Sequence, residues 1–341
     1  MKLGLREVFA LAMAGFALDA TAQMPAPPTP IPMRPAAPKP VPPRKPKPLV
    51  ALPNYDEVTS TRLQIFLDNN NFGPGKIDGQ MGEFFRKALI SYKIAHGMLP
   101  TGAVDRLLAQ VPTPFTTYTI APDDEKFVGP APTKPSEQAK LKSLPYGSLL
   151  EFVAERFHSA EDYLKKLNPG KDLEKLKPGD TVTVPNVIPF QIEKLGEGSV
   201  PPNPAFANRR VIIDTVERTL EVRENNTLIY EFPITPGSKT LPAPKGMWKI
   251  LGIATMPWFR HDEGVLNYGV RTGNYFNLPP GPNNPVGILW MGLNKPGIGI
   301  HGTNNPETIG RAGSHGCIRM ANWDAAKIKD LVTVGNVVAI Y

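Results

Sequence analysis

The chain has 341 residues and a formal net charge of +7, and this length predicts more than one domain. The positive charge is spread along the chain without a basic stripe, which argues against a nucleic acid as partner. The single cysteine excludes an intramolecular disulfide and leaves a buried thiol, an intermolecular bridge or a reactive thiol.

The N-terminus is typical of an export signal. Lys2 and Arg6 precede the apolar run VFALAMAGFAL, and the small-residue pattern at 20–22 is a cleavage site. We predict a signal peptide at residues 1–22, a mature chain without a transmembrane segment, and a location in the periplasm or facing a cell wall; an amphipathic N-terminal helix is the alternative. Residues 23–53 are dominated by proline, which favours an extended polyproline linker.

Residues 54–112 carry apolar side chains at helical spacing and predict a small all-α module of three helices. A glycine-rich turn, GPGKIDGQMG, separates the first two helices. The segment resembles the peptidoglycan-binding helical module, and a generic helical bundle is the alternative. The matching positions are Gly75, Ile77, Asp78, Gly79, Gly82, Ala88, Leu89, Thr101, Gly102 and Asp105.

Residues 116–187 predict a small α+β module. TTYTI is a strand, a lysine- and proline-rich stretch follows as an exposed insertion, and two helices lead to an alternating strand in VTVPNV. Ser148 is the candidate cap of the first helix. The order of elements resembles the LysM module, which implies binding of N-acetylglucosamine polymers, although the insertion departs from the usual compact form.

Residues 209–341 predict a mostly β domain. Three strand-like runs begin it, and Asn225–Asn226 is a credible hairpin turn between the second and third. Short glycine-bounded strands follow, and ANWDAAKIKDLV is the one clear helix. The segment at residues 255–285 is rich in Gly, Pro, Asn and aromatic residues, which suggests a lid.

The stretch SHGCIRM contains Cys317, with His315 two residues earlier and His301 sixteen residues upstream. A thiol attacks as the thiolate, and a nearby histidine can take its proton. Backbone N–H groups at Gly316 can point at a developing oxyanion, and Arg319 can hold a substrate carboxylate or help to position the loop. A zinc site is one alternative, with His261, Asp262 and Glu263 as the only obvious further donors. A buried, inert cysteine is the other.

The stretch HGTNNPETIGRAGSHGCIRM closely resembles the catalytic signature of YkuD-type L,D-transpeptidases, and LPPGPNNPVGILWMGL upstream also looks like that family. The resemblance implies a sandwich-like β domain, with Cys317 as nucleophile and His301 as base. It further implies that the carbonyl of Gly302 orients the imidazole. The substrate and oxyanion site would involve Ser314, His315, Gly316, Arg319 and Asn304.

The reaction that this resemblance implies needs no metal or organic cofactor. Cys317 attacks the amide before the terminal D-alanine of a peptidoglycan stem tetrapeptide, and an amine acceptor resolves the thioester. The acceptor is another stem, which gives a 3-3 crosslink, or a lysine of an envelope protein. Water as acceptor would make an L,D-carboxypeptidase, and a non-catalytic wall-binding scaffold is the remaining alternative. Carbapenem-type β-lactams are expected to acylate Cys317.

Overall fold

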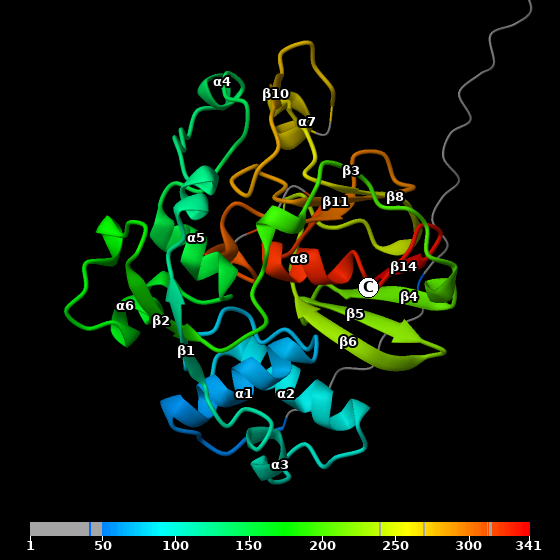
Figure 1. Cartoon of the computed structure of the whole chain (residues 1–341). Coiled ribbons are helices and arrows are strands. Elements are labelled where there is room, and N and C mark those ends of the chain that lie inside the picture. The colour runs from blue at the N-terminus through cyan, green and yellow to red at the C-terminus, as the bar shows by residue number, and fades with distance from the viewer. Residues whose placement is uncertain (1–40, 42–49, 239, 269, 312, 314–315) are drawn as a thin grey trace, which may run out of the picture. The chain divides into compact units, whose positions relative to one another are not determined.

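The computed structural model describes residues 41, 50–238, 240–268, 270–311, 313 and 316–341. The predicted signal peptide and nearly all of the proline-rich linker lie outside these residues. The described residues from 50 onward belong to one compact unit (Figure 1). Among the residues described, no helix has the length and apolar character needed to cross a membrane.

The helical segment has the helices expected from its periodicity, although the third is a single turn. The carboxylate of Asp56 caps the first helix by accepting a hydrogen bond from the Thr59 backbone N–H at 2.8 Å. Leu63, Phe66 and Leu67 of that helix are buried, as predicted. The helices are α1 (Glu57–Asn69), α2 (Glu83–Ala95) and α3 (Asp105–Leu108).

The second segment pairs two antiparallel strands around its two longer helices, and a single helical turn precedes them. Ser148 caps the first of the two longer helices, as predicted, because its hydroxyl accepts from the Glu151 backbone N–H at 3.0 Å. The expected exposed insertion is only partly exposed, since Leu144 is buried and its N–H donates to the Pro280 carbonyl at 2.8 Å. The elements are β1 (Phe115–Thr119), α4 (Pro135–Gln138), α5 (Leu149–Arg156), α6 (Glu161–Leu167) and β2 (Thr181–Pro185).

The third segment is mostly β, as predicted. Its main sheet has ten strands in one continuous hydrogen-bonded order, β6-β5-β4-β14-β8-β11-β12-β13-β7 with β3 beside β8, and it forms a nearly closed barrel in place of the expected sandwich. The strands are β3 (Gly198–Ser199), β4 (Arg209–Asp214), β5 (Thr219–Glu224), β6 (Thr227–Pro233), β7 (Thr235–Pro236), β8 (Gly246–Thr255), β11 (Leu289–Leu293), β12 (Gly299–His301), β13 (Ile318–Arg319) and β14 (Val337–Ile340).

The β5–β6 hairpin turns at Asn225 and Asn226, as predicted, and both residues have positive φ (48° and 74°), as a two-residue turn matched to the strand twist requires. The charged side chain of Glu231 is nevertheless buried. The helical segment covers this part of the sheet: the Glu231 N–H donates to the Asn71 carbonyl, and the Glu231 carbonyl accepts from Gly73. Figure 1 shows α2 next to β6.

Two further pieces complete the β domain. The predicted C-terminal helix is α8 (Asn322–Ile328), which follows β13 directly. The segment expected as a lid contains the antiparallel strands β9 (Phe259–His261) and β10 (Phe276–Leu278), with the unexpected helix α7 (Glu263–Tyr268) between them. Buried Asp262 organises this hairpin, because its carboxylate accepts from the backbone N–H of Gly264 and from the hydroxyl and N–H of Thr272.

Candidate active site

Cys317 and His301 are brought together by the parallel pairing of β12 and β13. Ile300 lies opposite Ile318 in this pair, and both isoleucine side chains are fully buried in the core. Cys317 immediately precedes Ile318, and His301 immediately follows Ile300. Because successive side chains of a strand point to opposite faces, Cys317 and His301 share the face opposite the two isoleucines.

His301 is held in the tautomer that a general base needs. Its Nδ1 lies 2.6 Å from the Gly302 carbonyl oxygen, and a carbonyl can only accept, so Nδ1 carries the proton and Nε2 keeps its lone pair. Burial lowers the pKa of His301 to about 4; the hydrogen bond to Gly302 opposes this shift, and the charge of Arg319 adds to it. The imidazole is therefore neutral at neutral pH and able to accept a proton.

Trp290 supports the His301 ring from the neighbouring strand. The two residues are paired across β11 and β12, and their rings stack with centroids 5.7 Å apart and planes at 22°. Trp290 falls within the family-like stretch upstream of the histidine, but nothing in the sequence alone assigned it a contact.

The thiol of Cys317 is only partly exposed and donates to the Gly297 carbonyl, with 3.4 Å between sulfur and oxygen. Burial raises its pKa above the ordinary thiol value, while a backbone hydrogen bond from Gly299 and the charge of Arg319 lower it. With the thiol pKa raised and the imidazole pKa lowered, the resting pair is a neutral thiol beside a neutral imidazole. Such a pair transfers its proton during attack.

Asn322, at the start of α8, fixes the backbone that follows His301. Its buried Oδ1 accepts from the N–H groups of Thr303 at 3.1 Å and Ile288 at 3.2 Å. A Cβ at Gly302 would lie 2.3 Å from this oxygen, so only glycine fits there. Sequence reasoning missed Asn322, because no local pattern links it to a turn nineteen residues earlier.

Arg319 lies on the shared face, opposite His301 in the strand register. Its guanidinium donates from Nη2 to the Gly313 carbonyl at 3.0 Å and from Nη1 to the Thr308 hydroxyl at 3.4 Å. Arg319 therefore holds the loop that leads to Cys317, one of the two roles that the sequence suggested for it.

The structure describes only two of the four other residues expected at the substrate site, Gly316 and Asn304. Ser314 and His315 lie outside the described residues. Gly316 is buried and has a φ of 95°. Asn304 lines a separate cavity of about 390 Å³ together with Glu155 and Trp323, so its expected role at the substrate site stays a prediction.

A larger cavity, of about 820 Å³, includes in its lining two residues that contact the Cys317–His301 pair. It is lined on one side by Trp290 and by Gly297, whose carbonyl accepts from Cys317. On the other side it is lined by residues of the 255–285 segment, among them Trp258 and Arg260. The 255–285 segment therefore shares a cavity with contacts of Cys317 and His301, and its role as a lid stays a prediction.

Metal ligation finds no support among the residues that the structure describes, where no three His, Cys, Asp or Glu side chains gather closely enough to hold an ion. The carboxylate of Asp262 is engaged within its own hairpin by Arg260 and Thr272.

Comparison with known proteins identifies the β domain. Residues 208–340 match the YkuD family, described as the L,D-transpeptidase catalytic domain. The chain is 29% identical over 194 residues to a putative L,D-transpeptidase, YkuD, of Bacillus licheniformis, covering 57% of this chain and 94% of that protein. It is 24% identical over 229 residues to a probable L,D-transpeptidase, ErfK/SrfK, of Escherichia coli K12, covering 66% of this chain and 67% of that protein.

Among solved structures, L,D-transpeptidase 3 from Mycobacterium tuberculosis matches with a TM-score of 0.32 and 15% identity, over 49% of this chain and 76% of that one. A score this low supports no statement about the site. No family match covers the segments at 54–112 and 116–187, so their resemblance to wall-binding modules stays a prediction.

Proposed function

We propose, from the premise that residues 208–340 form an L,D-transpeptidase catalytic domain, that Cys317 is the nucleophile and His301 its general base. The observation that carries this proposal is the β12–β13 pairing, which puts the thiol and a neutral imidazole on one face with Nε2 free to accept. Trp290 stacks on the imidazole, and Asn322 holds the backbone that follows His301.

The first chemical step is acylation. The Cys317 sulfur attacks the carbonyl carbon of the amide before the terminal D-alanine of a stem tetrapeptide, and His301 Nε2 takes the thiol proton. Backbone N–H groups at Gly316 and Cys317 stabilise the oxyanion of the tetrahedral intermediate. The C–N bond then breaks, His301 returns the proton to the leaving amine, and a thioester remains on Cys317.

The second step transfers the acyl group to an amine. The neutral amine of another stem peptide attacks the thioester, His301 removes its proton, and the thiolate leaves and is reprotonated. This forms a 3-3 crosslink. Transfer to a lysine of an envelope protein uses the same chemistry, and water in place of the amine gives L,D-carboxypeptidase activity. The residues named here bind the acyl donor and do not select among these acceptors.

We assign supporting roles to the segments before the catalytic domain. A signal peptide at 1–22 directs export, and the proline-rich residues 23–53 act as a spacer. The helical segment at 54–112 and the LysM-like segment at 116–187 bind peptidoglycan and raise the local concentration of a polymeric substrate. The resemblance of their sequence patterns to wall-binding modules supports this assignment.

Muropeptide analysis tests the proposed reaction. The mature protein is incubated with a disaccharide tetrapeptide, and the products are separated and weighed. We expect 3-3 linked dimers and released D-alanine, both absent with Cys317→Ala. Tripeptide alone would assign the carboxypeptidase reaction. Products that survive in Cys317→Ala would exclude Cys317 as nucleophile.

A further inference from the structure

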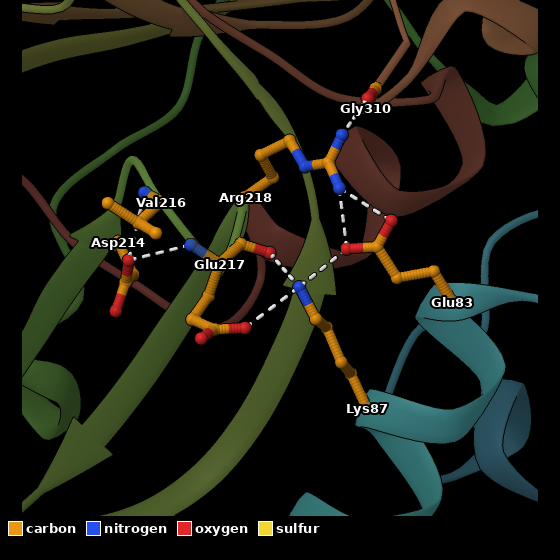
Figure 2. Close-up of polar contacts among 7 residues, drawn as sticks. All are labelled: Glu83, Lys87, Asp214, Val216, Glu217, Arg218 and Gly310. Carbon is orange, nitrogen blue, oxygen red and sulfur yellow. Dashed lines mark hydrogen bonds and ion pairs between the residues drawn. The ribbon is translucent and has the colours of Figure 1, made fainter. Parts of the chain in front are cut away.

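A cluster of charged side chains joins α2 of the helical segment to the catalytic domain. Figure 2 shows Arg218, in the turn between β4 and β5, lying between Glu83 of α2 and the backbone of Gly310. Its Nη2 contacts both oxygens of the Glu83 carboxylate at 2.5 Å, and its Nη1 donates to the Gly310 carbonyl at 2.5 Å. One guanidinium therefore connects two segments that lie far apart in sequence.

Lys87 reinforces the same junction one helical turn later. Its ammonium group lies 2.7 Å from the Glu83 carboxylate and 2.8 Å from that of Glu217, and it also donates to the Glu217 carbonyl at 2.7 Å. Burial raises the pKa of Glu83, but hydrogen bonds from Lys87 and Arg218 outweigh this and lower it. The carboxylate is thus charged and paired with two cations at neutral pH.

Gly310 belongs to the loop that leads to Cys317, and it is held on three sides. Its carbonyl accepts from Arg218, and its N–H donates to the Thr235 hydroxyl at 2.7 Å. The third side is the Phe84 ring of α2: a Cβ at Gly310 would lie 2.2 Å from that ring. Thr235 is itself paired with Arg319 across β7 and β13, so the constraint reaches the strand that follows the thiol.

The backbone at Arg218 is unusual for a residue with a side chain. Its φ is 56°, in the left-handed region that disfavours side chains. The Asp214 carboxylate supports this turn by accepting from the N–H groups of Val216 at 3.0 Å and Glu217 at 2.8 Å. Such a conformation persists where surrounding contacts maintain it. It indicates that the position of the Arg218 side chain is important enough to offset the backbone strain.

We propose that Glu83 and Arg218 are positioning residues, through which the helical segment fixes the loop that carries Cys317 into the active site. The inference rests on the proposed role of Cys317. Stability alone is a weak reason for this junction, because the side chains of Arg218 and Glu83 are 35% and 47% exposed, and exposed ion pairs contribute little to folding. The helical segment is then part of the catalytic apparatus as well as a candidate wall-binding module.

The test compares two variants with a matched control in the full mature chain. Arg218→Gly removes the guanidinium at a φ that glycine adopts freely, and Glu83→Ala removes the α2 carboxylate while leaving the Arg218–Gly310 contact possible. Glu174→Ala breaks the Lys165–Glu174 ion pair (2.8 Å), which lies wholly within the second segment. For each protein, kcat and KM are measured with the tetrapeptide donor, together with sacculus binding and the unfolding midpoint.

We expect kcat to fall roughly tenfold or more in Arg218→Gly, because small displacements of a reacting group are costly. Glu83→Ala should show a smaller fall in kcat. KM and sacculus binding should stay close to the wild-type values in both variants, and Glu174→Ala should keep the wild-type kcat. The inference is overturned if kcat is unchanged in both variants, if KM or sacculus binding alone changes, or if Glu174→Ala loses as much activity. An active Cys317→Ala variant would instead remove the proposed nucleophile on which the inference rests.

Discussion

Two buried histidines of this chain have similar packing, but we assign them different roles, one as a general base and one as a structural residue. His301 and His158 are both nearly inaccessible to solvent, each stacks on a tryptophan, and each forms a hydrogen bond through Nδ1. The partner of His301 is the neutral carbonyl of Gly302, and the ring shares a face of the strand pair with the partly exposed thiol of Cys317. The partner of His158 is the buried carboxylate of Asp68, at 2.9 Å. Burial and stacking therefore do not distinguish a base from a structural histidine.

The surroundings of His158 form a junction between all three segments. Asp68 comes from α1, His158 follows α5, and Lys327 of α8 lies 2.8 Å from the same Asp68 oxygen. Burial alone would raise the pKa of Asp68, but the charges of His158 and Lys327 lower it well below its ordinary value. Nε2 of His158 is buried and has no hydrogen-bond partner among the residues that the structure describes. We interpret this histidine as a connection between segments.

The contrast between His301 and His158 is tested by replacing His301, and this change should have the largest effect on turnover. His301→Ala should reduce turnover of the tetrapeptide by about 10²–10⁴-fold, the usual contribution of a general base. The free energy of unfolding should change much less than the rate. Steady-state kinetics beside a urea titration provide both values, and a variant with wild-type turnover would remove His301 as the base.

Breaking the junction at His158 should have the opposite effect to the loss of His301: the free energy of unfolding should fall, and the rate of acylation should change little. Asp68→Asn removes the buried anion that faces both His158 and Lys327, and loss of one member of a buried ion pair typically costs about 3–5 kcal/mol. The shift is measured by urea unfolding. The folded fraction of the variant should acylate Cys317 at close to the wild-type rate; an unchanged unfolding free energy would contradict the structural role.

The pH dependence of acylation sharpens the comparison further. Only a neutral imidazole can accept the thiol proton, and burial lowers the pKa of His301 to about 4. The rate of Cys317 acylation by a carbapenem should therefore fall as the pH drops through about 4. Rates measured across an acid pH series decide this, because a fall centred near the ordinary histidine pKa of about 6.5 would show an unshifted base.

The last prediction concerns Asp324, beside the His158 junction. Burial raises its pKa to about 8, Lys327 opposes the shift, and Asp68 adds to it. The folded state thus holds a proton that the unfolded state has lost above about pH 4. This contribution to stability is present at low pH and is lost as the pH rises through about 8. Asp324→Asn should flatten that decline in urea titrations between about pH 3 and pH 9, a range that spans both pKa values, and an identical slope would refute it.

Much of the architecture follows from local pattern. Helical spacing located α1 and α2, Ser148 was recognised as a cap, and Asn225–Asn226 as a hairpin turn. These features depend on neighbouring residues, which a sequence displays directly. Likewise, a cysteine with histidines in glycine-rich surroundings indicated the chemistry, although the sequence offered no distance between Cys317 and His301.

What the sequence did not reveal depends on contacts between distant segments. Glu231 alternates with apolar residues as a solvent-facing side chain would, yet the helical segment buries it. Trp290 stacks on the histidine from another strand, and Asn322 of α8 holds the backbone at Thr303 that follows it. The contact of Arg218 with Glu83 joins residues 135 positions apart. Such pairings arise only when the chain is folded, so composition and spacing carry no trace of them.

The central claim is that a neutral His301 activates Cys317, and intact-protein mass spectrometry tests it most directly. Wild type, His301→Gln and Asp68→Asn are mixed with the disaccharide tetrapeptide and sampled over time. We predict a thioester adduct on Cys317 that forms readily in wild type and in folded Asp68→Asn, and far more slowly in His301→Gln. Equal rates in wild type and His301→Gln, or an adduct on another residue, would contradict the account.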